Sequence, residues 1–415
     1  MLKAKRLSLD NGLEVVLIND NKKNTSSAYL SVNVGGFVKD FKMNGKDYHL
    51  KYGIAHFLEH YLLENSIYGN VMQSFGNDYI DSNGFTSPYR TVFYISTVHD
   101  FEDNLVKLLN VVNNPLFDKE KIEGVKPPIL REIERCIDNP YRKVNEFCFK
   151  QIFKEVPFDV TLGNKEDIKN LSIEDIKLFH DAFYNAKNEM LVISGKFNEE
   201  KIIKLVKDTY KKFNNNCDSK IYEYKEIDKV VSKESSTKDK DDFIRISHKI
   251  NIKNIKPLDR DKLSYYLSFL KYANLSERSD LFKYILDNDI SKFAITNFGD
   301  FGIDKNYLLI NTILYTDKFE EGRKLLFDKL NNLEYDEQLF EQWKNKQIIA
   351  KVNSLEEFSN AVKDYMDNVY LYGLYQFDDI DFVRKLNIEE CKKLMSKLDT
   401  TNYSVIICRK GEENE

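Results

Sequence analysis

The segment GIAHFLEHYLLEN, residues 53–65, places two histidines four residues apart, with a glutamate directly before the second. On an α-helix each residue turns by about 100°, so the side chains of His56, Glu59 and His60 share one sector about 100° wide. The apolar residues fall on the opposite side of the same helix: Ile54, Leu58, Tyr61 and Leu62. The segment therefore predicts an amphipathic helix with an apolar back and a front of two imidazoles and one carboxylate.

The front of this helix has the residue types of a metal site. Two histidines at positions i and i+4 can bind one zinc ion through neutral ring nitrogens. Glu59 lies in the same sector without being needed as a ligand, so it can take a proton from water as a general base. The order H-x-x-E-H is the inverted zincin motif of metallopeptidases. The alternative interpretation is a solvated helix face that carries two histidines by chance.

A catalytic zinc ion needs a third protein ligand and one open position. The candidates are Glu132 and Glu134, on a helical pattern that we place at residues 128–154. An apolar stripe marks the buried side of this helix, and the two glutamates stand at its two edges. Helical geometry alone prefers neither of them.

The rest of the first half mixes strand and helix patterns in irregular order. Asn11-Gly12 predicts a hairpin turn between two strands. Further strands are expected at residues 28–34, 84–98 and 190–194, and further helices at residues 103–112, 172–183 and 199–213. Because the order does not alternate strictly, the pattern favours an α+β fold over a doubly wound sheet.

The composition changes at a charged stretch near the middle of the chain. We expect a linker at residues 216–240, between a first domain at 1–215 and a second at 241–415. The first half closes with FYNAKNEMLVISGKF and the second with LDTTNYSVIICRKG. Each reads as a helix end, a polar turn and an apolar strand, which suggests an internal duplication.

The overall composition excludes some classes of protein and leaves others. The 62 basic and 67 acidic residues give a net charge of −5, which argues against a nucleic-acid or membrane-surface binder. No secretory signal and no apolar run of membrane-spanning length is evident. The five cysteines form no CxxC pair, so we expect free thiols and a cytoplasmic location.

Five segments together resemble the insulinase/pitrilysin family of zinc metallopeptidases. They are NGLEVVLI (11–18), GIAHFLEH (53–60), NGFTSPYRTVFYIS (83–96), LREIERCIDNP (130–140) and FYNAKNEMLVISG (183–195). The chain looks most similar to bacterial half-size members and to the zinc-bearing subunit of mitochondrial processing peptidase. The resemblance implies an α+β fold of two similar domains. Each would be an antiparallel-rich mixed sheet flanked by helices, and together they would form half of a clamshell.

The resemblance also implies roles for individual residues. His56, His60 and Glu132 match the family's zinc ligands, and Glu59 matches its general base. Residues 85–96 correspond to an edge strand beside the metal, to which an extended peptide could add as a further strand. The substrate-binding residues implied there are Asn83, Phe85, Thr86 and Ser87. The alternative for this segment is an ordinary internal strand.

The sequence departs from the family pattern at three places. Val125 stands where relatives often have a carboxylate that supports the third ligand. The pair Pro127-Pro128 favours a helix that begins late over one that runs through. Asp280 and Phe293 stand where active members carry an arginine and a tyrosine that bind the substrate carbonyl; Arg278 and Tyr284 are near but out of register.

These observations predict a zinc metalloendopeptidase that hydrolyses short or unfolded peptides in a closed chamber, with peptide precursors and leader peptides among the candidate substrates. The missing arginine and tyrosine predict a heterodimer with a homologous chain that lacks H-x-x-E-H; a homodimer is the second choice. The alternatives are a non-catalytic or peptide-binding subunit of a peptidase complex and a structural zinc module. No nucleic-acid or membrane partner is expected.

Overall fold

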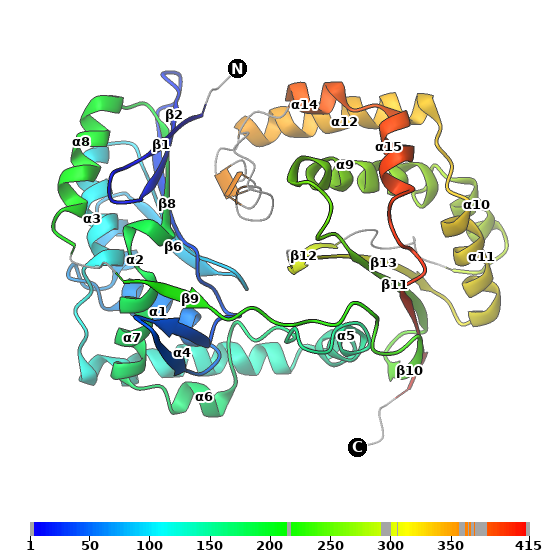
Figure 1. Cartoon of the computed structure of the whole chain (residues 1–415), viewed down its shortest axis with the longest axis horizontal. Coiled ribbons are helices and arrows are strands. Elements are labelled where there is room, and N and C mark those ends of the chain that lie inside the picture. The colour runs from blue at the N-terminus through cyan, green and yellow to red at the C-terminus, as the bar shows by residue number, and fades with distance from the viewer. Residues whose placement is uncertain are drawn as a thin grey trace. The chain divides into compact units, whose positions relative to one another are not determined.

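The computed structural model describes residues 4–213, 217–291, 300–304, 306–356, 362–363, 365–366, 369 and 380–411. The chain forms two compact units (Figure 1). Unit 1 comprises Met1–Asp138 and Asp159–Glu223, and unit 2 comprises Asn139–Phe158 and Tyr224–Glu415. The chain therefore passes between the units after Asp138, after Phe158 and after Glu223.

Unit 1 is built on a mixed sheet in the order β1-β2-β8-β3-β7-β6, in which only β2 and β8 pair in parallel. Its strands are β1 Lys5–Ser8, β2 Glu14–Asn19, β3 Ser26–Val32, β6 Asp81–Thr86, β7 Thr91–Thr97 and β8 Glu189–Gly195. A small second sheet contains β4 Asp40–Met43, β5 Lys46–His49 and β9 Ser219–Ile221. The helices are α1 Ile54–Glu64, α2 Val71–Asn77, α3 Phe101–Asn113, α4 Lys119–Ile137, α6 Lys165–Lys169, α7 Ile173–Phe183 and α8 Glu199–Tyr210, with a short 3₁₀ turn, η1, at Ala186–Asn188.

The core of unit 1 lies between one face of this sheet and the helices. Alternate residues of the central strands point into it because side chains of a strand alternate between faces. Leu30 of β3 and Phe93 of β7 are fully buried there, together with Phe57 and Leu58 of α1. Burial of the apolar back of α1 thus fixes the helix against the sheet, as its pattern predicts.

The strand expected at residues 84–98 is in fact a hairpin of β6 and β7. The turn is held by Ser87, whose backbone N–H donates to the carbonyl oxygen of Arg90 and whose hydroxyl accepts from the Arg90 N–H. Pro88 has no N–H to give to a continuing ladder. The apolar alternation continues on both sides of the turn, which is why the pattern resembles one long strand.

The helix expected at residues 128–154 is two helices, α4 and α5 Pro140–Lys150. Contrary to our expectation, α4 begins at Lys119 and runs through Pro127 and Pro128. Its buried residues lie on both sides of the prolines: Ile122, Val125, Ile129 and Ile133. Packing of this continuous stripe outweighs the backbone hydrogen bonds that two prolines remove.

Unit 2 is built on a five-stranded sheet in the order β10-β14-β11-β13-β12. Its strands are β10 Glu234–Asp239, β11 Phe243–Asn251, β12 Asp300–Asp304, β13 Tyr307–Tyr315 and β14 Tyr403–Lys410. Its helices are α5, α9 Pro257–Asn274, α10 Asp280–Asp287, α11 Phe319–Asn331, α12 Glu337–Glu356, α14 Ile380–Lys385 and α15 Ile388–Met395.

The two units repeat one topology. The order β2-β8-β3-β7-β6 of unit 1 corresponds to β10-β14-β11-β13-β12 of unit 2, and in both only the first pair is parallel. The two segments whose similarity suggested a duplication end in β8 and β14, which hold the same place. This confirms the α+β fold with two similar domains. α9 occupies the place of α1 in this order but carries no histidine.

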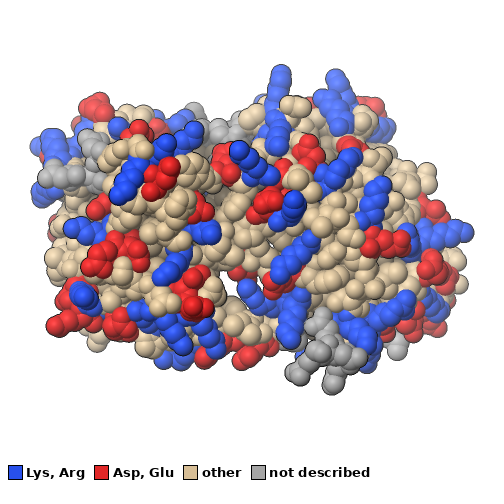
Figure 2. Space-filling model, turned by 60° about the horizontal axis from the view of Figure 1, so that its bottom comes forward, with Lys and Arg blue, Asp and Glu red and all other residues tan. Residues whose placement is uncertain are grey.

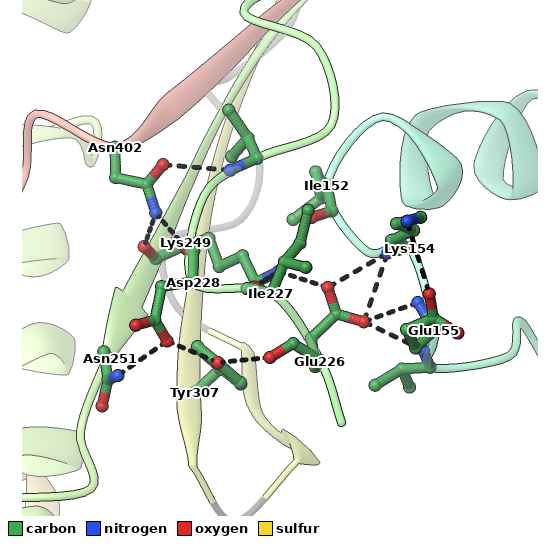
Figure 3. Close-up of polar contacts among 12 residues, drawn as sticks. Ile152, Lys154, Glu155, Glu226, Ile227, Asp228, Lys249, Asn251, Tyr307 and Asn402 are labelled. Carbon is green, nitrogen blue, oxygen red and sulfur yellow. Dashed lines mark hydrogen bonds and ion pairs between the residues drawn. The ribbon is translucent and has the colours of Figure 1, made fainter. Parts of the chain in front are cut away.

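The segment expected to be a linker, residues 216–240, contains β9 and β10 and divides between the units at Glu223. It is also anchored in unit 2 by a buried ion pair, because the Lys249 ammonium lies 2.7 Å from the Glu226 carboxylate and both side chains are at most 1% exposed (Figure 3). The Glu226 carboxylate also accepts from the backbone N–H groups of residues 154–156. The charges that suggested a solvated linker are thus partly neutralised inside the fold.

Basic and acidic side chains intermingle over the face of the molecule in Figure 2. None of the described helices combines the length and the apolar character that a membrane span requires.

Candidate metal centre

The predicted metal-binding helix is present as α1, and its start depends on a glycine. Gly53 caps the helix with φ of 85°, a left-handed conformation that disfavours other residues. A Cβ there would also lie 2.6 Å from the carbonyl oxygen of Leu162. The helix front is covered rather than open to solvent, since His56 is only 7% and Glu59 only 5% exposed.

The side chains of His56, His60 and Glu132 converge. One potential ligand atom from each lies within 4.8 Å of the other two, and no other such group occurs in the described part of the chain. Glu132 Oε2 lies 3.5 Å from His56 Nε2 and 3.9 Å from His60 Nε2. The two histidines come from one helix and the glutamate from α4, which packs against it.

Glu134, the other candidate for the third ligand, lies elsewhere. Its carboxylate is exposed and accepts a hydrogen bond of 2.9 Å from the Lys165 ammonium. This partner holds the pKa of Glu134 below its usual range. The structure therefore separates two glutamates that helical geometry left equal.

The three side chains fit a zinc ion. A tetrahedral ion with ligands at about 2.1 Å separates their atoms by about 3.4 Å, close to the His56–Glu132 distance. Burial, with a smaller contribution from the charge of His60, lowers the pKa of His56 to about 3. Its imidazole is therefore neutral at physiological pH, the form that binds a metal.

Glu59 lies beside this group and contacts the edge strand. Its Oε2 accepts a hydrogen bond of 2.9 Å from the Thr86 hydroxyl of β6. Its Oε1 faces Gly84, where a Cβ would come within 3.2 Å of that oxygen. Burial raises the pKa of Glu59 to about 7, against the opposing effects of the charge of His60 and the Thr86 hydrogen bond. A carboxylate with such a pKa can both accept and return a proton near neutral pH.

His60 is more exposed than His56 and has a partner on its outer nitrogen. Its Nδ1 lies 3.2 Å from Oε1 of Glu64, one helical turn further along α1. Burial would lower the pKa of His60, but the Glu64 hydrogen bond and the charges of Glu59, Glu64 and Glu132 raise it overall. Sequence reasoning overlooked Glu64, although the spacing of four residues was a usable signal.

The residues expected to bind substrate lie on β6 and in the turn after it. β6 pairs only with β7 and ends the sheet, whereas β7 also pairs with β3 and is internal. Of these two strands, β6 is the edge strand, and residues 91–96 of the expected stretch lie on the internal strand β7. The side chains of Thr86 and Ser87 are engaged with Glu59 and Arg90. Asn83 Oδ1 accepts from the Gly84 N–H, and Phe85 is partly exposed.

The places where the sequence departs from the family pattern are also located. Val125 is fully buried in the core. Within the described residues, the buried Nδ1 of His56 has no hydrogen-bond partner. Asp280 is the exposed first residue of α10, and Arg278 stacks over the ring of Tyr272 at 5.3 Å. Phe293 lies outside the described residues.

Known proteins of similar sequence match this chain over about half of its length. The protein named uncharacterized zinc protease YmfH of Bacillus subtilis is 31% identical over 235 residues, 55% of each chain. The probable mitochondrial-processing peptidase subunit beta of Schizosaccharomyces pombe is 26% identical over 208 residues, 49% of this chain and 44% of that protein. The matched region spans about half the length of these relatives.

Solved structures share the fold over nearly the whole chain. A putative M16-like peptidase from Alicyclobacillus acidocaldarius superposes with a TM-score of 0.83, at 18% identity over 99% of both chains. A protease from Helicobacter pylori has a TM-score of 0.78, also at 18% identity, over 98% of this chain and 99% of that one. Identities this low establish the fold alone.

Family models account for both units. Residues 14–164 match the model described as insulinase (peptidase family M16), and residues 170–347 match the model described as the peptidase M16 inactive domain. The first match contains α1 and Glu132, and the second contains most of the repeated topology that lacks the histidine pair. Together the two models cover most of the chain, which therefore belongs to the insulinase family of peptidases, peptidase family M16.

Proposed function

We propose that this chain is a zinc-dependent endopeptidase that hydrolyses short or unfolded peptides. The observation that carries the proposal is the convergence of His56, His60 and Glu132 within 4.8 Å, with Glu59 beside them. A structural zinc site would not need a buried carboxylate with a raised pKa at that position. Several relatives are named zinc proteases, in agreement with this assignment.

The proposed mechanism divides the work among these residues. A zinc ion, when bound, would polarise the substrate carbonyl and acidify water. His56, His60 and Glu132 would hold that ion. Glu59 would accept a proton from the attacking water and deliver it to the leaving amine. The Thr86 hydroxyl donates a hydrogen bond to Oε2 of Glu59, so Oε1 would carry out this proton transfer.

The proposed substrate site is the open edge of β6. An extended peptide could pair with this strand through main-chain hydrogen bonds, which demand little of the peptide sequence. Asn83, Phe85, Thr86 and Ser87 would contact the peptide chiefly through their backbone groups, since two of their side chains are already engaged. Such pairing requires an extended segment and so favours unfolded peptides, including precursors and leader peptides.

We further propose that the active form is a heterodimer with a homologous chain that lacks H-x-x-E-H. Asp280 stands where a substrate-binding arginine is expected, so this chain would hold the metal and its partner would supply the cationic group. Peptide hydrolysis should be slow with the purified chain and restored by the homologue. Robust hydrolysis by a homodimer would contradict this part of the proposal.

The deciding experiment compares Glu59→Gln with the wild type. Cleavage of a fluorogenic peptide by the full assembly should require zinc and stop on chelation. Glu59→Gln should retain zinc, measured by elemental analysis, and lose turnover at least about a hundredfold. If the variant loses zinc, Glu59 is a ligand and not a base. If neither protein cleaves but both bind peptide, the chain is a peptide-binding subunit.

A further inference from the structure

His60 lies between two carboxylates, one on each nitrogen of its ring. Nε2 faces Oε2 of Glu132 at 3.9 Å, and Nδ1 faces Oε1 of Glu64 at 3.2 Å. The two ring nitrogens point in different directions, so a group on Nδ1 cannot share the ion that Nε2 binds. Glu64 accordingly stands outside the group of three converging ligand atoms.

The two histidines of α1 are held in different ways. His56 has a side chain only 9% exposed, and its buried Nδ1 has no partner within the described residues. Apart from the Glu132 carboxylate, which lies 3.5 Å from Nε2, close packing sets the orientation of that ring. The His60 side chain is 26% exposed, so packing constrains it less, and a hydrogen bond to Glu64 is available to fix it.

Glu64 also occupies a position that the helix itself does not favour. It is the last residue of α1, where the partial negative charge of the helix C-terminus repels a carboxylate. A purely structural account would therefore expect removal of Glu64 to leave the helix as stable or to stabilise it slightly. The contact with His60 gives this carboxylate a different role.

We propose that Glu64 is a positioning residue for the metal site: its carboxylate accepts a hydrogen bond from the Nδ1–H of His60, which fixes that tautomer and turns Nε2 toward the ion. This inference rests on the proposed zinc site. Carboxylates that hold the outer nitrogen of a ligand histidine orient it and make it more basic, and their loss typically costs about 10- to 100-fold in metal affinity. Glu64 would supply this support from α1 itself, whereas Val125 supplies none from α4.

The test is the zinc dissociation constant of the full chain, measured by competition with a chromogenic chelator. Glu64→Ala should weaken zinc binding about 10- to 100-fold. Glu64→Gln keeps an oxygen acceptor without the charge and should weaken it less. The matched control is Glu134→Gln, which removes the charge of an exposed glutamate on the same helix as Glu132 and should leave zinc affinity unchanged. The melting temperature of the zinc-free protein should not fall in any of the three.

The outcomes separate this inference from the proposed function. Wild-type zinc affinity in both Glu64 variants would overturn the positioning role while leaving the zinc site intact. A wild-type chain that binds no zinc would overturn the proposed function itself. If Glu64→Ala lowers the melting temperature of the zinc-free protein, Glu64→Gln decides, because it preserves the shape of the side chain. A Glu64→Gln variant with unchanged affinity would then contradict the inference.

Discussion

Glu59 shows how a single residue can be prepared for chemistry by its neighbours. Its side chain extends from α1, and both of its oxygens lie against the edge strand: Oε2 contacts the Thr86 hydroxyl, and Oε1 lies so close to Gly84 that a Cβ there would come within 3.2 Å of it. The strand proposed to bind the peptide thus also sets the position of the proposed base. Movement of β6 on peptide binding would be transmitted directly to Glu59.

Replacing Thr86 by Val removes the hydroxyl and keeps the shape of the side chain. Hydrogen bonds to charged groups contribute about 1.5–3 kcal/mol, so we expect kcat to fall about tenfold or more. KM and zinc content should stay near their wild-type values. Thr86→Ser, which restores the hydroxyl, should recover most of kcat. A rise in KM without a change in kcat would instead assign Thr86 to substrate binding.

Glu132 and Glu134 provide a matched pair on one helix. Glu132→Gln replaces a proposed anionic ligand by a neutral amide and should leave the dialysed protein largely free of zinc. Glu134→Gln removes only an exposed ion pair with Lys165 and should retain a full equivalent of zinc. Elemental analysis of both proteins measures this difference. Equal zinc contents would show that the third ligand lies elsewhere.

The sequence predicted the roles of some of these residues and left those of others undecided. His56, Glu59 and His60 lie on one helix, so their relation follows from its period of 3.6 residues. The choice between Glu132 and Glu134 depends on which side of α4 meets α1, which no local pattern contains. Thr86 belongs to a strand far along the chain, and its contact with Glu59 arises only from the packing of β6 beside α1.

At the scale of elements, local chemistry decides some boundaries and packing decides others. The turn at Asn11-Gly12 forms as expected, with Gly12 at φ of 90°. The helix expected at residues 128–154 gave Pro127-Pro128 too much weight as a helix start and Asn139-Pro140 too little as a break. In α4 the buried stripe on both sides of Pro127 outweighs that preference, whereas Asn139 caps a new helix that starts at Pro140.

The prolines within α4 should therefore cost stability that a substitution can recover. Pro127 is exposed, so Pro127→Ala loses little packing and restores a backbone N–H that can reach the carbonyl of Glu123. We expect the free energy of unfolding of unit 1 to rise by about 1–3 kcal/mol. Differential scanning calorimetry measures this, with an exposed alanine substitution at Glu120 in the first turn of α4 as the control. A lower melting temperature for Pro127→Ala would show that Pro127 itself contributes to the stability of the fold.

At the scale of the whole molecule, the two units share a topology but differ in the residues that they carry at equivalent places: α1 has the histidine pair, and α9 has no histidine. Strand order and pairing direction follow a common pattern, and the similar endings of the two halves suggested this duplication. The division of the chain was not predictable, because residues 139–158 leave unit 1 and pack in unit 2 before the chain returns. One contact that holds them there joins Glu226 to the backbone of residues 154–156, and charge composition alone gives no sign of it.

Removal of one partner of the buried pair of Glu226 and Lys249 is expected to destabilise unit 2. The Lys249 ammonium donates to Glu226 and to the carbonyl oxygens of Ile152 and Ile227, inside the fold (Figure 3). Glu226→Gln would leave this ammonium buried without a counter-charge, which typically costs about 3–5 kcal/mol. Trp343, the only tryptophan and 1% exposed in unit 2, reports the unfolding of that unit by fluorescence in urea.

The same substitution should change how stability depends on pH. Burial would raise the pKa of Glu226, but Lys249 and the backbone N–H groups outweigh it and lower the pKa overall. A lowered pKa gives stability that is present above the unfolded value of about 4.3 and is lost as the pH falls through the folded value. Glu226→Gln should therefore flatten the acid side of the stability profile. Glu146→Gln, which removes an exposed pair with Lys150 in the same unit, should change neither profile nor stability by more than about 1 kcal/mol. Equal effects of the two substitutions would mean that the Glu226 carboxylate is hydrated rather than enclosed, and that residues 152–156 are held in unit 2 by apolar packing.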